Sequence, residues 1–349
     1  MKAHLRVVFL GFFVLVLGIS IGANGAVYER NLRKIGQINK EGPFLAIVIP
    51  NTFEMDPLLN SSSFVPHHKY PTLDVSGRRF RFGVLENKKV ILVMTGLGML
   101  NAGVTTQLLL TLFKVEGVLH YGIAGNANPK LQIGDVTIPQ YWAHTGLWNW
   151  QRFGDGPNDE LPLEINGDYT RKIGYLKFSD YNNKTIKGKP VDNLLNNVWF
   201  QPEEVFPIFG YPEVRQHAFW VPVSRRYFAV AEKLEGLKLE GCVNKTSCLP
   251  RTPKVVRVKR GISASVFVDN KAYREYLNSK FDATPIDMES AAIALVCFQQ
   301  NIHFIIIRAL SDLAGGGSSL SNEANTYTSL AAKNSVDALI KYVALLSSS

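Results

Sequence analysis

Cysteine is scarce in this sequence, with three residues among 349. This excludes a disulfide-rich scaffold, and Cys242 and Cys248, without a second nearby pair, make a poor zinc site. No internal repeat is present, which argues against a solenoid or a propeller. Charged residues make up only 19% of the chain, against 46% hydrophobic residues. This balance excludes intrinsic disorder and is typical of a globular protein with a large core.

A concentrated block of basic residues is also missing, although the formal net charge is +9. The densest basic groups are Arg78–Arg81 and Arg251–Arg260. Neither is interleaved with aromatic residues or belongs to a nucleic-acid-binding motif. We therefore interpret the charge as solvated surface and expect no nucleic-acid partner.

Beyond the N-terminus, the sequence has no segment long and apolar enough to span a bilayer. The N-terminus itself combines Lys2 and Arg6, the apolar run Val7–Leu17 and the small residues Ala23–Gly25. This pattern is typical of a secretory signal peptide and favours cleavage over a retained membrane anchor. We expect residues 1–25 to be removed, so that the mature chain no longer contacts the membrane.

Secretion changes how the cysteines are interpreted. In an oxidising compartment Cys242 and Cys248, six residues apart in a loop, would pair. Cys297 falls in an apolar helix, where we expect a buried thiol. Three glycosylation sequons in polar, loop-like surroundings begin at Asn60, Asn183 and Asn244.

The stretch 285–317 contains the densest functional signals. It predicts a nearly all-apolar helix over 291–299 and an isoleucine-rich strand over 303–310, of the kind buried in parallel sheets. Asp312 follows that strand, at the edge where open α/β sheets bind ligands. Asp287 and Glu289 stand before the helix. Each acid has an alternative role as a helix cap, but together they favour a site.

An earlier strand, 44–50, runs into a further acid, Glu54. If this strand belongs to the same parallel sheet, Glu54 and Asp312 lie at one edge. The alternative is that Glu54 caps a helix beginning near Pro57.

A third strand, 89–95, ends in Gly96 and Gly98 before a helix over 101–113. Glycines at this point let backbone N–H groups approach a ligand closely. A dinucleotide fingerprint is disfavoured, because Asn101 replaces its third glycine and no acid ends the next strand, 117–121.

Three collinear motifs resemble the nucleoside phosphorylase and nucleosidase superfamily, between about Pro43 and Leu346. They are Asp287-Met288-Glu289-Ser290-Ala291-Ala292 with Arg308-Ala309-Leu310-Ser311-Asp312, Thr95-Gly96-Leu97-Gly98-Met99-Leu100-Asn101-Ala102, and Gly122-Ile123-Ala124-Gly125 with Ile133-Gly134-Asp135-Val136. Ala143–Trp148 and Ser263–Asp269 make the chain most similar to the secreted plant branch that contains the bark storage proteins.

The resemblance implies a fold and a set of residue roles. The fold is one three-layer α/β/α domain over 26–349, with a largely parallel twisted sheet and an insertion at about 142–220. Asp312 would protonate the departing purine, and Glu54 would orient the attacking water. The implied substrate-binding residues are Glu289 at the ribose hydroxyls, Met288, Phe267 stacked on the base, Ser311, Ala124, Gly125, Gly98 and Asn101.

The resemblance also bears on the reaction. Phosphorylases of the superfamily carry Gly-Asp-Pro-x-Arg in the loop that here reads Asn51–Pro57, which has no glycine or arginine. We therefore favour hydrolysis of purine-type nucleosides, such as adenosine, methylthioadenosine or cytokinin ribosides. Two alternatives stay open: a phosphorylase with inorganic phosphate as co-substrate, and a storage protein with vestigial catalysis.

Further expectations follow from the same resemblance. It implies no metal or redox cofactor, a small-molecule nucleoside as partner, a homo-oligomer, and delivery to the apoplast or vacuole. The insertion is interpreted as a lid over the pocket. Its Trp148, Trp150 and Phe153 would either stack on the base or pack on the surface.

Overall fold

The computed structural model describes residues 29–316 and 323–348, apart from 153–154, 156–157, 160–171, 178–184, 187–188 and 191–196. The predicted signal peptide, Phe153 and Asn183 therefore lie outside the described residues. Among the helices of the described part, none combines the length and apolar character that a membrane crossing requires.

One eleven-stranded sheet forms the centre of the molecule. At its middle, β1 (Phe44–Ile49) runs parallel to β5 (Lys88–Met94) on one side and to β6 (Val115–Asn126) on the other. β6 also pairs in parallel with β18 (Phe304–Leu313). These strands are buried on both faces, which is why they read as continuous apolar runs.

The remaining strands extend this parallel centre. β7 (Val136–His144) and β17 (Ala283–Asp287) flank β16 (Val255–Ser263) in parallel, and β17 meets β6 antiparallel. The outer strands pair antiparallel: β2 (Phe64–Pro66), β3 (Thr72–Val75), β4 (Arg78–Leu85) and β15 (Val221–Pro222).

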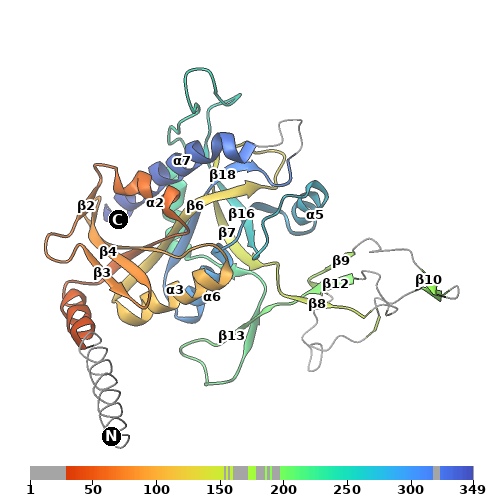
Figure 1. Cartoon of the computed structure of the whole chain (residues 1–349), viewed down its shortest axis with the longest axis horizontal. Helices are drawn as coiled ribbons and strands as arrows, with labels where there is room; N and C mark the ends of the chain where they lie inside the picture. Colours follow the sequence, from red (N-terminus) through yellow and green to blue (C-terminus); the bar gives the residue numbers. More distant parts are fainter. Residues whose placement is uncertain are drawn as a thin grey trace, which may run out of the picture.

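Helices cover both faces of the sheet (Figure 1). α2 (Thr52–Leu59), α4 (Arg225–Ala231) and α7 (Glu323–Ser347) pack on the face that holds Ile305 and Ile307. α3 (Met99–Leu112) and α6 (Ser290–Gln299) pack on the opposite face, which holds Phe304 and Ile306. The predicted three-layer α/β fold is therefore confirmed, and α5 (Lys271–Phe281) packs beside β17.

Several element boundaries differ from those predicted. β18 runs to Leu313, so Asp312 lies inside this strand and does not follow it. The helix expected near Pro57 begins at Thr52, because the side chain of Asn51 accepts a hydrogen bond from the backbone N–H of Glu54 and caps an earlier turn. β6 does not end at Tyr121 but continues to Asn126, because β18 pairs with it along the whole glycine-containing segment. Gly122–Gly125 thus belong to the sheet itself.

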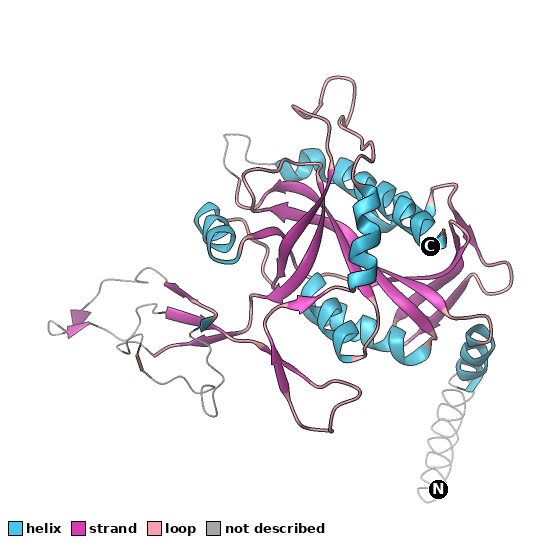
Figure 2. Ribbon diagram, turned by 180° about the vertical axis from the view of Figure 1, so that it is seen from behind, coloured by secondary structure: helices cyan, strands magenta, loops and turns pink. Residues whose placement is uncertain are grey.

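The described parts of the predicted insertion form small sheets beside the main one (Figure 2). β8 (Trp148–Trp150), β9 (Tyr175–Lys177) and β12 (Asn197–Phe200) make a three-stranded sheet. Two hairpins accompany it: β10 (Thr185–Ile186) with β11 (Lys189–Pro190), and β13 (Glu203–Val205) with β14 (Gln216–Ala218).

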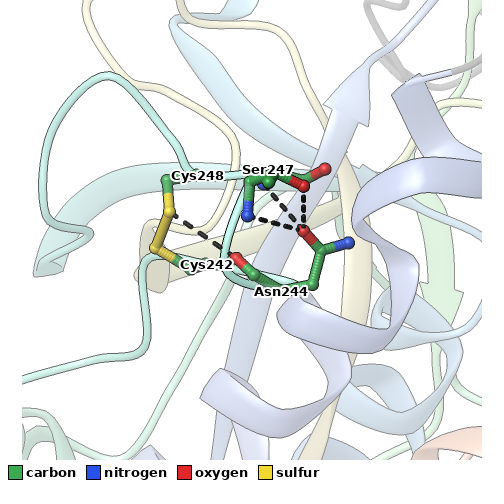
Figure 3. The surroundings of a disulfide bond; sticks show 5 residues. Cys242, Asn244, Ser247 and Cys248 are labelled. Carbon is green, nitrogen blue, oxygen red and sulfur yellow. Dashed lines mark hydrogen bonds between the residues drawn. A yellow bond between two sulfur atoms is a disulfide. The ribbon is translucent and has the colours of Figure 1, made fainter.

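The cysteines are arranged as predicted. Cys242 and Cys248 form a disulfide (Figure 3). Cys297 is a buried free thiol in α6. Inside the closed loop, Asn244 Oδ1 accepts hydrogen bonds from the backbone N–H groups of Thr246 and Ser247. The disulfide and this turn together fix an otherwise exposed loop.

We predict that replacing Cys242 with serine lowers the free energy of unfolding by about 2 kcal/mol, because the disulfide no longer restricts the unfolded chain. Urea denaturation of the oxidised protein measures this difference. Reducing the wild-type protein should bring it to the value of the variant. Equal stability of the oxidised wild type and the variant would contradict the prediction.

Candidate active site

A cavity of about 220 Å³ opens where β1, β6 and β18 end at a common edge of the sheet. Parallel strands deliver their carboxyl ends to one edge, so side chains distant in sequence meet there. Of the ten site residues predicted from the sequence, eight line this cavity: Glu54, Ala124, Gly125, Phe267, Met288, Glu289, Ser311 and Asp312.

The other two predicted residues lie outside the lining. The backbone N–H of Gly98 donates a hydrogen bond of 3.0 Å to Glu289 Oε1, so Gly98 positions a lining residue. Asn101 has an exposed side chain that bonds the Leu97 carbonyl and the Arg78 guanidinium.

The charge at the centre of the site belongs to Arg308, which is fully buried in β18. Its Nε lies 2.7 Å from Asp287 Oδ2, and its Nη2 lies 3.4 Å from Glu289 Oε2. Its Nη1 donates to the Ile123 carbonyl at 3.1 Å and lies 3.9 Å from Glu54 Oε1. A buried guanidinium is tolerated only with such a set of partners.

Asp287 holds the start of α6 and Arg308 at once. Its Oδ1 accepts hydrogen bonds from Ser263 Oγ at 2.6 Å and from the backbone N–H groups of Glu289 and Ser290. Its Oδ2 accepts from Ser290 Oγ and faces Arg308. Asp287 is therefore both the helix cap considered from the sequence and a part of the charged cluster.

Glu54 stands in the first turn of α2 with 1% of its surface exposed. The backbone N–H of Ile123 donates to its Oε1 at 2.7 Å, while Oε2 has no hydrogen-bond partner among the described residues. Burial raises the pKa of Glu54 from the ordinary 4.5 to about 8, and Arg308 only partly opposes this rise. Glu54 is a carboxyl group poised to exchange a proton near neutral pH.

Glu289 is a further buried carboxyl group on the cavity wall. Burial raises its pKa too, against the lowering effect of Arg308. Glu54 and Glu289 thus share one guanidinium, and each disfavours the charge of the other.

Asp312 owes its position to an irregularity in β18. Leu310 pairs with Ala124, and Asp312 pairs with the next residue of β6, Gly125. Ser311 is therefore an extra residue of β18 at this point, which makes a β-bulge. Such a bulge re-aims the side chains that follow it. Ser311 Oγ donates a hydrogen bond of 2.7 Å to Asp312 Oδ1, which fixes the acid on the cavity wall.

The mouth of the cavity is apolar. Phe53, Leu97, Val266 and Phe267 line it, and Phe267 remains 69% exposed. Trp148 and Trp150 are not among its described lining residues. Trp148 instead packs edge-on against Phe200 and Trp150, with ring centroids 6.2 and 6.3 Å away. Surface packing, the second of the two roles considered for these tryptophans, is what the structure contains.

A model of the phosphorylase superfamily matches residues 44–344. The chain belongs to the phosphorylase superfamily. Bark storage protein A of Populus deltoides is 32% identical over 91% of this chain and 92% of its own length. The 5'-methylthioadenosine/S-adenosylhomocysteine nucleosidase of Marinomonas sp. is 26% identical over 75% of this chain and 83% of its own length.

Solved structures of the superfamily share the fold. The 5'-methylthioadenosine/S-adenosylhomocysteine nucleosidase of Neisseria meningitidis, in complex with methylthio-immucillin-A, has a TM-score of 0.57 at 19% identity, covering 86% of this chain and 98% of that one. Futalosine hydrolase of Helicobacter pylori has a TM-score of 0.56 at 19% identity, with coverages of 86% and 96%.

Two residues of the site, Arg308 and His120, were given no role from the sequence, although Arg308 stands in one of the quoted motifs. A signal for both existed, because each is a lone charged or polar residue inside an apolar strand and needs a buried partner. Position 122 requires glycine, because the side chains of Arg308 and Glu54 lie too close to its backbone for a Cβ atom. A Cβ atom there would lie 2.4 Å from both Arg308 Nη1 and Glu54 Oε1.

A larger cavity of about 670 Å³ lies on the other side of Leu313. Its described lining is mainly apolar and includes one acid, Glu275, whose side chain is 61% exposed. Within the described ranges, no cluster of His, Cys, Asp and Glu has the arrangement of a metal site. The smaller cavity, with four acids on its wall, is therefore the candidate active site.

We predict that Gly122→Ala destabilises the protein by about 3 kcal/mol or more, because the added methyl group forces Arg308 and Glu54 apart. Gly103→Ala is the matched control. Its Cβ would meet only Ala292 Cβ at 3.9 Å, and alanine in a helix favours stability by up to about 1 kcal/mol. Thermal denaturation compares the two, and equal shifts would contradict the close-approach argument.

We predict that Glu54→Gln stabilises the protein at neutral pH. Folding raises the pKa of Glu54 from 4.5 to about 8, so the folded state binds this proton more tightly than the unfolded state does. The stabilisation of the folded protein by this proton is therefore complete below about pH 4.5 and is lost as the pH rises to about 8. The glutamine variant does not titrate at this position. It should match the wild type near pH 4.5 and exceed it by about 2–4 kcal/mol at pH 8. Denaturant unfolding at pH 4.5, 7 and 8.5 tests this, and a difference independent of pH would refute it.

Proposed function

We propose that this protein hydrolyses the N-glycosidic bond of purine-type nucleosides, such as adenosine, methylthioadenosine or cytokinin ribosides. The observation that carries the proposal is that Asp312 and the buried carboxyl group of Glu54 line the same cavity. Oε2 of Glu54 has no hydrogen-bond partner among the described residues. N-glycoside cleavage requires an acid at the leaving group and an activated nucleophile at the anomeric carbon.

Each step has a residue suited to it. Asp312 gives its proton to N7 of the purine as the bond between C1′ and the base nitrogen breaks. The sugar then carries positive charge, which Glu54 and Glu289 stabilise. A water molecule forms the new bond to C1′ and gives its proton to Glu54, which must be ionised to accept it. Glu289 binds the ribose hydroxyls, while Met288 and Phe267 contact the nucleoside.

Electrostatics favours water over phosphate as the nucleophile. The described lining includes Glu54, Asp287, Glu289 and Asp312 but no lysine, arginine or histidine. Arg308 stands behind this wall with its charge shared among carboxylates. A phosphate dianion entering the cavity would meet acids without a free cation, which is costly. Phosphorolysis remains the second candidate, because the superfamily includes phosphorylases by name.

A storage role without catalysis is the third candidate, since bark storage protein A is a relative. Storage requires neither a raised Glu54 pKa nor an unpartnered buried carboxylate oxygen. Both features of Glu54 lower the stability of the folded protein. Their presence therefore supports a catalytic role for the site.

Secretion and self-association remain proposals. The disulfide between Cys242 and Cys248 supports passage through an oxidising compartment and thus an apoplastic or vacuolar location. The exposed positions of α3 include Leu100 and Val104 but no charged residue. This favours a homo-oligomer, because charged residues are depleted at interface cores.

The function is tested by base release from adenosine in buffers with and without inorganic phosphate. We predict release independent of phosphate, with kcat/KM rising towards pH 8 as Glu54 ionises. Strict dependence on phosphate would establish the phosphorylase, and no release from any nucleoside would favour storage.

We predict that Asp312→Asn lowers kcat about 10²–10⁴-fold, because asparagine cannot deliver a proton to the departing base. Stability should change by no more than about 1 kcal/mol. A nitrophenyl riboside, whose leaving group needs no protonation, serves as the control and should be largely spared. Unchanged turnover with a large loss of stability would make Asp312 a structural residue.

A further inference from the structure

His120 lies in the middle of β6 and is fully buried. It has no role in the reaction steps proposed above. Its Nδ1 lies 2.8 Å from the backbone carbonyl of Val48 on the neighbouring strand β1. Its Nε2 meets Nη2 of Arg308. One imidazole thus joins the backbone of the sheet to the guanidinium behind the site.

The two contacts determine where the imidazole proton sits. A carbonyl oxygen only accepts hydrogen bonds, so Nδ1 carries the proton and donates it to Val48. A guanidinium only donates, so Nε2 offers its lone pair to Arg308. Burial and the neighbouring guanidinium both hold the pKa of His120 well below its ordinary 6.5, in agreement with this neutral tautomer.

We infer that His120 is a positioning residue: its neutral Nε2 fixes the rotation of the Arg308 guanidinium so that Nη1 faces Glu54 and Nη2 faces Glu289. The Asp287 carboxylate holds the Nε edge of Arg308, and the Ile123 carbonyl accepts a hydrogen bond of 3.1 Å from Nη1. The remaining nitrogen, Nη2, has Glu289 as a long contact at 3.4 Å, so the imidazole of His120 is its close acceptor and completes the set of contacts that fixes the guanidinium. This inference rests on the proposed function, because it concerns how Glu54 and Glu289 are held for the reaction.

The choice of a histidine has a physical reason. A carboxylate at this point would add a fourth acid to the three around Arg308, and an apolar residue would leave Nη2 without a close acceptor. A neutral imidazole supplies a lone pair without adding charge. It thereby leaves the guanidinium's positive charge available to Glu54 and Glu289.

Two amide variants separate the two contacts of His120. In His120→Asn the amide lies at the position of Nδ1, so it retains the bond to Val48 and loses the acceptor for Arg308. In His120→Gln the amide lies at the position of Nε2, so its oxygen accepts from Arg308 and the bond to Val48 is lost.

The expected activities differ accordingly. We expect His120→Asn to lower kcat about 10- to 30-fold with little change in KM, since a hydrogen bond to a charged group has been removed. His120→Gln should restore most of that loss. The thermal stabilities should follow the opposite order, because only the asparagine variant keeps the backbone bond. If activity instead follows stability, or both variants match the wild type, the inference is wrong.

A measurement without substrate separates this inference from the proposed function. The charged and titratable groups that interact with Glu54 are Arg308 from β18, Glu289 from the start of α6 and Tyr121 from β6. If Arg308 turns away, its lowering effect on Glu54 weakens and the titration midpoint of Glu54 rises above that of the wild type.

¹³C NMR of glutamate-labelled protein, with the Glu54 signal assigned through Glu54→Gln, reports this midpoint directly. We expect a higher midpoint in His120→Asn than in the wild type or His120→Gln. Equal midpoints in all three would overturn the inference whether or not any nucleoside is cleaved. A raised midpoint in a protein without activity would leave the inference standing and remove the proposed function.

Discussion

The arrangement of the site depends on one buried positive charge. Arg308 sits inside the sheet, where an isolated guanidinium would be prohibitively costly, and its partners come from four different elements. Asp287 ends β17, Glu289 is the residue before α6, Glu54 lies in the first turn of α2 and His120 lies in β6. Folding the sheet around Arg308 therefore also assembles the acids that face the cavity.

The carboxyl groups around Arg308 differ in how completely their oxygens are hydrogen-bonded. Asp287 is saturated with hydrogen bonds and serves the helix and Arg308. Glu54 is farthest from the guanidinium and keeps one oxygen unpartnered within the described chain. Incomplete compensation raises its pKa into the range where a group exchanges protons at physiological pH. A fully satisfied cluster would be more stable and chemically inert.

The apolar strand patterns predicted the α/β fold and placed Glu54 and Asp312 at one edge of the sheet, whereas the other predicted lining residues came from the resemblance to the superfamily. Glu54 lies just beyond one apolar strand and Asp312 near the end of another, and parallel pairing brings the ends of such strands together. Arg308 and His120 were missed as site residues, since their roles depend on which strands are neighbours. Strand order is not encoded in local pattern. The sequence left the tryptophans undecided between base stacking and surface packing, because the segment around them has no sustained period.

The bulge at Ser311 determines the position of Asp312 through the length of the strand and not through residue identity. Side chains alternate along a strand, so one residue more or less moves every later side chain to the opposite face. A deletion of one codon between Leu310 and Asp312 would preserve every acid of the motif and still turn the acid away from its neighbours. Relatives with the same acids but a different spacing at this point are therefore expected to keep the fold and lose the chemistry.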